Sequence, residues 1–262
     1  MKSAGMRTMA LVLCLLMLAS GVAMGEGMAY QVSTLNALML GLYDGVVTVE
    51  DLLAHGDTGL GTLDRLDGEM ITLDGVVYQI KADGQVVEAT GEATVPFGVV
   101  VPFEADAVEV LDEPVEGMDA LMACLNALEL VAENPNRIYV VKLTGSFGLV
   151  HTRSVPAQEK PYPPLGEVTK TQQEFTYEDV EGTIVAAYFP AYLSDVNLHG
   201  WHLHFLSEDR TKGGHLLDAQ LDSGLIEVDA IDRFLLELPD TPEFAAAPLG
   251  DDLAEAIEAA ER

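Results

Sequence analysis

The segment GWHLHFLSEDRTKGGH, residues 200–215, holds three histidines in a pattern that favours two adjacent strands. His202 and His204 are two residues apart, so on a strand both imidazoles point to one face, while the apolar residues beside them pack on the other. The polar and glycine-containing stretch 207–214 predicts a turn, and His215 opens the next strand. We therefore expect a hairpin that returns His215 beside the first two histidines.

Three neutral imidazoles bind Zn²⁺ well and leave coordination positions for water or substrate, as catalytic rather than structural sites do. Iron, manganese or copper also accept such ligands. Asp209 and Asp218 are available as hydrogen-bond partners for the ligand histidines. The alternative is a hydrogen-bonded pair of histidines on a β face, with His215 unrelated to it. His199 has the opposite phase and is expected in a loop.

The charge of the chain limits its function. The 262 residues include 13 basic and 43 acidic side chains, a formal charge of -30, which argues against a partner such as DNA, RNA or an anionic bilayer. Hydrophobic residues make up 49% and charged residues 21%, so the chain can bury a substantial core. An enzyme or binding protein for small molecules suits this composition better.

Residues 1–25 have the pattern of a secretory signal peptide. Lys2 and Arg7 precede an apolar run over residues 9–19, and small residues follow it. The run is too short for a membrane span, which needs roughly 20 residues. We expect export, with no membrane association after cleavage. Removal of the two cations leaves 11 basic against 43 acidic residues, a charge of -32.

Cys14 leaves with the signal peptide, so Cys124 is the one cysteine of the mature sequence and no intramolecular disulfide can form. Its apolar helical surroundings favour a buried inert thiol over a nucleophile. The fold must then rest on its core or on a metal. The sequence has no serine hydrolase elbow, phosphate-binding glycine loop, dinucleotide fingerprint or paired zinc-ribbon cysteines.

Hydrophobic periodicity predicts helices at residues 34–43, 48–55 and 118–132. Glycines 56, 59, 61 and 68 break the helical pattern after the second of these. Strand patterns follow one another along the rest of the chain, at 70–73, 76–80, 97–103, 138–153, 174–177, 183–189, 201–207, 215–221 and 225–228. Asp74-Gly75 predicts a tight hairpin between the first two strands. Residues 231–238 suit either a strand or a helix.

The proline-rich stretch 155–164 is the best candidate boundary between two parts. We expect an N-terminal α/β part at 30–155 and a mostly antiparallel β part at 156–244 that carries the metal site. The acidic tail, 245–262, is weakly helical by composition, and a frayed terminus is its simplest interpretation.

Several blocks of the sequence resemble the acetolactate decarboxylases, in the same order and over roughly residues 30–244. The two strongest are GWHLHF (200–205) and GGH (213–215). The others are STLNALMLG (33–41), GLGT (59–62), LDGEM (66–70), VKLTG (141–145), TR (152–153), VP (155–156) and PYP (161–163).

The resemblance implies a zinc enzyme that converts 2-acetolactate to acetoin and CO₂ through a metal-stabilised enediolate. It places the zinc ligands at His202, His204 and His215. It also implies an α+β fold, mixed with α/β, in a two-part chain with mixed and antiparallel sheets and few helices, assembled as a homodimer.

The same resemblance places catalytic residues at Thr62, Glu69 and Arg153. It also implies that the acidic tail, 245–262, reaches back to the active site with a C-terminal glutamate, which falls on Glu261, with Glu258 as the second choice. Arg suits a substrate carboxylate because its planar fork binds both oxygens, although a surface ion pair would also account for it. Glu69 suits a proton relay or a solvated carboxylate, and Thr62 a substrate contact or a turn cap. Glu261 or Arg153 is the candidate proton donor.

Two other functions remain open from the sequence alone. One is a different three-histidine metalloenzyme, such as a cupin-like oxygenase, which would consume oxygen. The other is a secreted acidic metal-binding module without catalysis, which would have no open coordination position.

Overall fold

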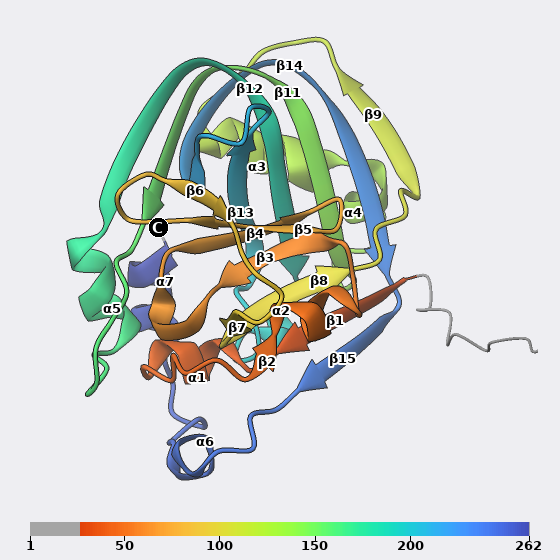
Figure 1. The fold of residues 1–262 in the computed structure, drawn as a ribbon. Coiled ribbons are helices and arrows are strands. Elements are labelled where there is room, and N and C mark those ends of the chain that lie inside the picture. Colours follow the sequence, from red (N-terminus) through yellow and green to blue (C-terminus); the bar gives the residue numbers. More distant parts are fainter. Residues whose placement is uncertain (1–26, 262) are drawn as a thin grey trace, which may run out of the picture.

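The computed structural model describes residues 27–261, without the side chains of Glu258 and Glu261. The expected signal peptide at 1–25 therefore lies outside the described residues. The described chain folds into two large β-sheets with short helices around them, the α+β class that the sequence predicts (Figure 1).

The first sheet has seven strands in the order β15-β1-β8-β3-β4-β5-β6. Its neighbours pair antiparallel except β1 and β15, which are parallel. The strands are β1 (Met28–Val32), β3 (Thr58–Thr62), β4 (Glu69–Leu73), β5 (Val76–Ile80), β6 (Val86–Glu88), β8 (Phe97–Val101) and β15 (Arg233–Glu237). The predicted hairpin at Asp74-Gly75 is confirmed, and both residues have the positive φ that such a turn requires.

The second sheet has six strands, with β14 paired to β11 along its length and to β9 and β10 on its other edge. These strands are β9 (Ala107–Leu111), β10 (Val115–Glu116), β11 (Ile138–Ser154), β12 (Gln173–Phe189), β13 (Gly200–Ser207) and β14 (Gly213–Ile231). The start of β14 also pairs with β13, so the strands β14-β11-β12-β13 close on themselves.

Two of these strands, β12 and β14, are longer than the sequence pattern predicts. The pattern suggested breaks near Gly182 and Gly224, yet the strands run through both positions. Gly145 of β11 lies opposite both of these glycines, so the three form a row across β12, β11 and β14. A Cβ at Gly145 would lie 2.2 Å from the Ser223 carbonyl oxygen. The glycines thus allow a close approach of backbones within continuous strands, and do not end them.

The sequence analysis missed three strands of the first sheet, β1, β3 and β6, and β3 shows why. Gly59 and Gly61 of β3 indicated a loop, but a Cβ at Gly59 would lie 1.9 Å from the Val99 carbonyl oxygen of β8. Glycine is needed here because β3 and β8 approach too closely for side chains on both strands. A glycine-rich strand between two apolar strands therefore has the composition of a loop.

The helices are short and lie around the sheets. They are α1 (Leu35–Met39), α2 (Val49–Leu53), α3 (Met118–Ala127), α4 (Glu129–Glu133), α5 (Leu165–Val168), α6 (Pro242–Ala246) and α7 (Ala254–Glu261). Three 3-10 turns lie at Asp64–Leu66, Thr169–Thr171 and Ala191–Leu193, and β2 (Val47–Thr48) pairs with β7 (Thr94–Val95). The single helix predicted at 118–132 is two helices, because Leu128 has extended backbone angles, φ -52° and ψ 132°.

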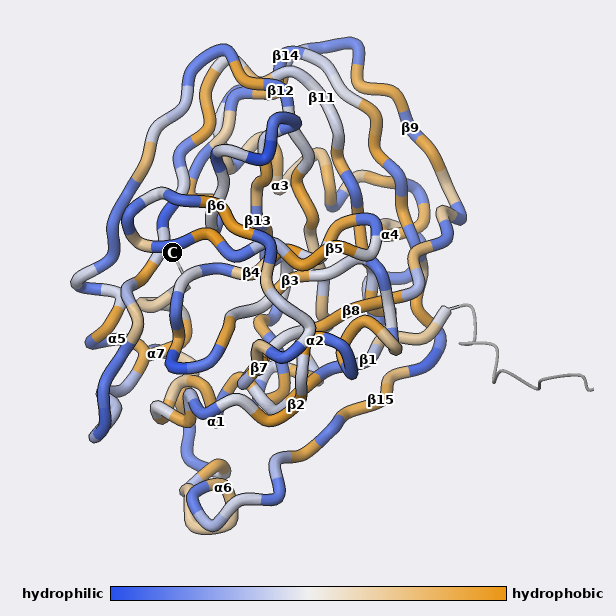
Figure 2. Tube along the Cα trace, in the orientation of Figure 1, coloured by the Kyte–Doolittle hydropathy of each residue, from blue (hydrophilic) through white to orange (hydrophobic). Residues whose placement is uncertain are grey.

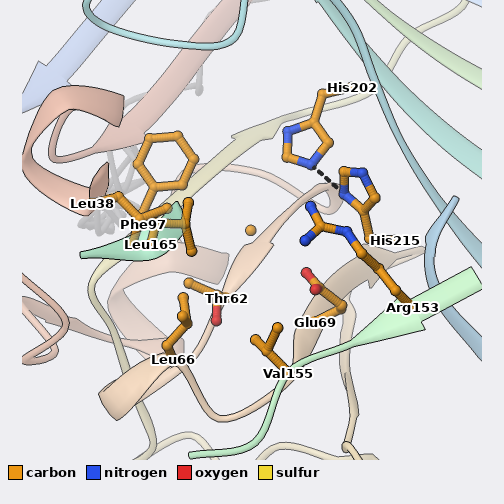
Figure 3. A pocket seen from close by; sticks show the side chains of 11 residues that line it. Leu38, Thr62, Leu66, Glu69, Phe97, Arg153, Val155, Leu165, His202 and His215 are labelled. Carbon is orange, nitrogen blue, oxygen red and sulfur yellow. Dashed lines mark hydrogen bonds between the residues drawn. The ribbon is translucent and has the colours of Figure 1, made fainter. Parts of the chain in front are cut away.

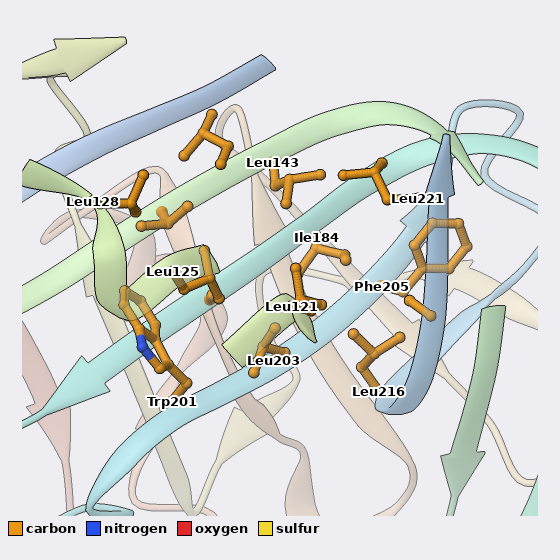
Figure 4. Close-up of a cluster of buried hydrophobic side chains, with 14 of the residues drawn as sticks. Leu121, Leu125, Leu128, Leu143, Ile184, Trp201, Leu203, Phe205, Leu216 and Leu221 are labelled. Atoms are coloured by element: carbon orange, nitrogen blue, oxygen red, sulfur yellow. The ribbon is translucent and has the colours of Figure 1, made fainter. Parts of the chain in front are cut away.

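Helix α3 lies under the arch of β11, β12 and β14 (Figure 1). Its buried face, Leu121 and Leu125, packs with Ile184 of β12 and Leu203 of β13 in the largest apolar cluster (Figure 4). Cys124 is partly buried against this cluster, and burial raises the pKa of its thiol, as expected of an inert cysteine.

The opposite face of β12 and β13 packs on the seven-stranded sheet. Val185 and Leu206 contact Ile71 and Ile80 there. Figure 2 shows β8, at the centre of this sheet, as a hydrophobic strand. The space between the two sheets is therefore the second apolar layer of the protein.

Both sheets draw strands from both sides of the proline-rich stretch 155–164. Strand β11 ends at Ser154, just before it, but pairs with β12 and β14, which follow it. Strand β15, near the C-terminal end, pairs with β1 in the other sheet. The proposed two-part division stays a prediction about folding units.

Asp229 gives the fold a pH dependence that can be measured. Its side chain is 3% exposed, and burial, with smaller contributions from Asp106, Glu104 and Asp57, raises its pKa to about 6. A raised carboxyl pKa favours the folded state at low pH, so this contribution is lost as the pH rises from about 4 through 6. We expect Asp229→Asn to raise the free energy of unfolding at pH 8 by on the order of 2 kcal/mol, and by less as the pH falls toward 4.

Urea unfolding of Asp229→Asn at pH 4.5 and 8 measures this difference. Asp222→Asn is the matched control, because Asp222 is exposed and the substitution removes the same charge. An equal stabilisation by both variants would attribute the effect to net charge and contradict the role of burial.

Candidate active site

The three histidines of the opening segment converge between the two sheets. The predicted hairpin is confirmed, because His204 of β13 pairs directly with His215 of β14. His202 Nε2 lies 3.1 Å from His204 Nε2 and 3.1 Å from His215 Nδ1. The side chains are buried, with 8%, 0% and 4% exposure for His202, His204 and His215. Trp201, Leu203 and Phe205 pack on the opposite face with α3, also as predicted.

Gly213 and Gly214 allow the strand that carries His215 to enter between β13 and β11. A Cβ at Gly213 would lie 2.6 Å from the Phe205 carbonyl oxygen, and one at Gly214 would lie 2.6 Å from the Arg153 carbonyl oxygen. Gly214 also has φ +140°, which L side chains rarely adopt. Both glycines are therefore needed for His215 to reach its partners.

A β-bulge brings Arg153 opposite His215. Strands β11 and β14 shift register between His151 and Thr152, so that Leu217 of β14 is left without an opposite residue. Without this shift His215 would pair with Ser154, whose side chain points to the other face of the sheet. Bulges of this kind commonly redirect a side chain next to a functional site.

The facing sheet supplies Thr62 and Glu69. These two residues are direct partners in the β3–β4 pair, so their side chains share a face, and both are buried, with 4% and 8% exposure. Glu69 Oε2 lies 3.5 Å from His204 Nε2. Thr62 Oγ1 donates a 2.7 Å hydrogen bond to the Gly68 carbonyl oxygen, so the hydroxyl closes the turn between the two strands.

That turn holds an unusual backbone. Arg65 and Leu66 have φ values of 62° and 57°, in the left-handed region that non-glycine residues rarely occupy, and Gly68 has φ 81°. Gly68 N donates to the Val155 carbonyl oxygen, and Gln79 Nε2 donates to the Asp67 carbonyl oxygen. Neighbouring segments thus stabilise the strained conformation, which directs Leu66 into the site.

Burial keeps the imidazoles of His202 and His204 neutral. Desolvation, with a smaller contribution from the positive charge of Arg153, lowers the pKa of His202 to about 3. Burial, followed by the effect of His202, also lowers the pKa of His204 well below its ordinary value. Neutral imidazole is the form whose ring nitrogen can bind a metal ion.

The three histidines fit a metal ion. Two nitrogens at about 2.0 Å from a tetrahedral zinc ion lie roughly 3.3 Å apart, close to the two 3.1 Å separations here. His204 Nδ1 is 2.9 Å from the Met70 carbonyl oxygen, to which it donates, so its Nε2 carries a lone pair. Among the described residues, this is the one group of three or more metal-binding side chains that converge in this way.

A small cavity joins these groups (Figure 3). His202, His215, Arg153 and Glu69 lie along one side of it, with Thr62 between them and the apolar side. The apolar side is formed by side chains from several elements, namely Leu38, Leu66, Phe97, Val155 and Leu165. The cavity can hold a small molecule whose polar and alkyl groups face opposite walls.

The C-terminal tail packs behind the apolar wall. Ile257 and Ala260 of α7 are buried in one cluster with Leu38, Leu165 and Phe97. The tail's interpretation as a frayed terminus is therefore wrong for α7, which is a helix with a buried face. The side chains of Glu261 and Glu258 lie outside the described part of the chain, so the choice between them stays a prediction.

The structure brings together Thr62, Glu69, Arg153 and the three histidines. It does not place Asp209 and Asp218 beside the histidines. Asp209 accepts hydrogen bonds from Ser207 and Thr211 in the β13–β14 turn, and Asp218 accepts from Met118 N at the start of α3. The hydrogen-bond partner of His204 is instead the backbone carbonyl of Met70. A backbone contact of this kind is not visible in the side-chain chemistry of the sequence.

Sequence reasoning also missed the apolar wall. Its members Leu38 and Leu66 lie within blocks 33–41 and 66–70, which carry the family resemblance, but as apolar residues they indicated only a core. Their position in the cavity depends on the packing of α1 and on the strained turn.

We expect the purified protein to bind about one divalent metal ion per chain, and His204→Ala to lose it, because a two-nitrogen site binds such ions much more weakly. Elemental analysis after dialysis measures the content. His199→Ala is the matched control, since His199 is an exposed histidine outside the cluster. A metal-free wild type, or full occupancy in His204→Ala, would refute the site.

Comparison with known proteins agrees with this geometry. The family described as Alpha-acetolactate decarboxylase matches residues 29–251. An alpha-acetolactate decarboxylase of Methanosarcina mazei is 45% identical over 233 residues, 89% of this chain and 80% of that protein. The enzyme of the same name from Brevibacillus brevis is 43% identical over 86% of this chain and 77% of its own length.

The fold has the same relatives. The crystal structure of alpha-acetolactate decarboxylase from Bacillus subtilis strain 168 superposes with a TM-score of 0.85 and 35% identity, covering 89% of this chain and 99% of that one. Within the described residues, no helix has the length and apolar character needed to cross a membrane. These matches show that the chain belongs to the alpha-acetolactate decarboxylase family of carboxy-lyases.

Proposed function

We propose that the protein is a zinc-dependent decarboxylase that converts 2-acetolactate to acetoin and CO₂. The observation that carries the proposal is that Thr62, Glu69 and Arg153 line one cavity with His202 and His215, although they come from distant parts of the chain. The family relatives bear the name of this activity. A homodimer remains an expectation from the same resemblance.

The cavity suits a small 2-hydroxy-3-keto acid. Arg153 is 4% exposed, so its charge acts in a site largely shielded from water, where it attracts a carboxylate strongly despite the chain's net charge of -30. Its planar fork can bind both carboxylate oxygens. The apolar wall opposite it accepts the methyl groups of the substrate.

His202, His204 and His215 would hold the metal. A zinc ion supplies, when bound, positive charge beside the substrate oxygens on which negative charge develops as CO₂ leaves. Thr62 donates its hydroxyl proton to the Gly68 carbonyl, so its oxygen is left to accept a hydrogen bond, for example from the substrate hydroxyl.

Loss of CO₂ leaves the bonding electrons on the substrate as an enediolate, which needs one proton on carbon to become acetoin. Glu69, buried beside His204, can hold or relay a proton at the oxygen end. Glu261 of α7 is the candidate donor to carbon, with Arg153 as the other choice, because α7 packs on the cluster that lines the cavity.

Purified protein supplied with racemic acetolactate should release CO₂ and form acetoin, and a chelator should abolish both. In Arg153→Lys we expect kcat/KM to fall by about a hundredfold, because Lys keeps the charge but loses the two-point contact, while metal content stays normal. Arg137→Lys is the matched control, since Arg137 forms an exposed ion pair with Asp232.

Oxygen consumption with bound iron would favour an oxygenase instead. Metal binding without turnover would favour a binding module. Wild-type kinetics in Arg153→Lys would leave Arg153 without a role in substrate binding.

A second prediction separates the two tail glutamates. We expect Glu261→Gln to lower kcat by about a hundredfold, with metal content unchanged, because proton delivery to carbon is lost, while Glu258→Gln retains most activity. Steady-state kinetics with acetolactate measures both. These point variants are preferable to truncation, because deletion of α7 would also remove Ile257 and Ala260 from the apolar cluster. The opposite order of the two variants would assign the role to Glu258.

A further inference from the structure

Arg153 is held by a series of hydrogen-bonded side chains that leads from the cavity to the surface. Its Nη1 donates to Gln172 Oε1 at 3.3 Å. Gln172 Nε2 donates to Glu174 Oε1 at 2.8 Å, and Glu174 Oε2 lies 3.1 Å from His151 Nε2. The series thus runs from the buried guanidinium of Arg153 to the carboxylate of Glu174, whose side chain is 49% exposed.

Strand pairing places these groups together. Arg153 of β11 is the direct partner of Glu174 of β12, and His151 lies two residues before Arg153 on the same face. Gln172 ends the 3-10 turn Thr169–Thr171 immediately before β12 begins, two residues before Glu174. The β11–β12 pair therefore positions the three residues that follow Arg153 in this hydrogen-bonded series, Gln172, Glu174 and His151.

The two neighbours of Gln172, Arg153 and Glu174, allow its side-chain amide only one orientation. A guanidinium only donates hydrogen bonds and an ionised carboxylate only accepts them. The hydrogen bond from Gln172 is the largest cause of the lowered pKa of Glu174, which is therefore ionised at neutral pH. Gln172 must then direct its NH₂ to Glu174 and its oxygen to Arg153.

We propose that Gln172 is a positioning residue for Arg153, and that Glu174 and His151 orient Gln172. This inference rests on the proposed function, in which Arg153 binds the substrate carboxylate. The amide oxygen of Gln172 is neutral, so this hydrogen bond holds the guanidinium in place without adding a negative charge at that position.

The test uses Gln172→Leu, which keeps the size of the side chain but cannot accept a hydrogen bond. We expect KM for acetolactate to rise about tenfold, more than kcat falls, because a displaced guanidinium binds the carboxylate less well. Gln173→Leu is the matched control. Gln173 is exposed, and its amide donates to the carbonyl oxygens of Thr171 and Gln172 rather than to Arg153.

Two competitive inhibitors distinguish positioning from general damage. 2-Hydroxyisobutyrate carries a carboxylate, and butane-2,3-diol does not. Gln172→Leu should weaken the first by about tenfold and leave the second and the metal content unchanged. Equal weakening of both inhibitors, or of neither, would overturn the proposal.

Glu174→Ala removes the group that orients the Gln172 amide, and it provides the same test if Gln172→Leu does not fold. We expect a smaller change in the same direction, by about threefold, again confined to the carboxylate inhibitor. Calorimetric binding of both inhibitors needs no turnover. A wild type that binds them but releases no CO₂ would therefore refute the proposed function and still test Gln172.

Discussion

The site depends on the passage of one strand between two others. The first residues of β14 pair with β13 on one side and with β11 on the other, so His215 has His204 and Arg153 as direct neighbours. Gly213 and Gly214 make this passage possible, because any side chain there would collide with the backbone of β13 or β11. The same strand passage thus closes the second sheet and brings the three histidines together.

The second requirement is the contact between the sheets. Glu69 and Thr62 reach the histidines only because the seven-stranded sheet packs against β12 and β13, and Ser154 Oγ reinforces that contact by donating to the Ile80 carbonyl oxygen. Enclosure between the sheets also removes water from the imidazoles of His202 and His204, which lowers their pKa and keeps them neutral. The packing that stabilises the fold therefore also sets the protonation state of these two histidines.

The sequence predicted those parts of the site that follow from local periodicity. The spacing of His202 and His204 gave their common face, and the polar turn gave the return of His215. The bulge at Leu217 has no such signal, yet it decides which β11 residue meets His215. Gly182 and Gly224 led to wrong strand boundaries, because glycine indicates a strand end and a close backbone contact equally well. Gln172 was not identified because its role exists only across the β11–β12 pair.

The two sides of the cavity differ in how they are held. The polar groups stand on strands of the two sheets, where pairing and burial leave each side chain little freedom. Much of the apolar side is carried by α1, α5 and the 62–69 turn, and α7 packs behind it from the far end of the chain. Short helices depend on such tertiary contacts for their stability, since they form few hydrogen bonds of their own. The polar side of the cavity is thus held by strand pairing, whereas the apolar side depends on tertiary contacts among short helices and a turn.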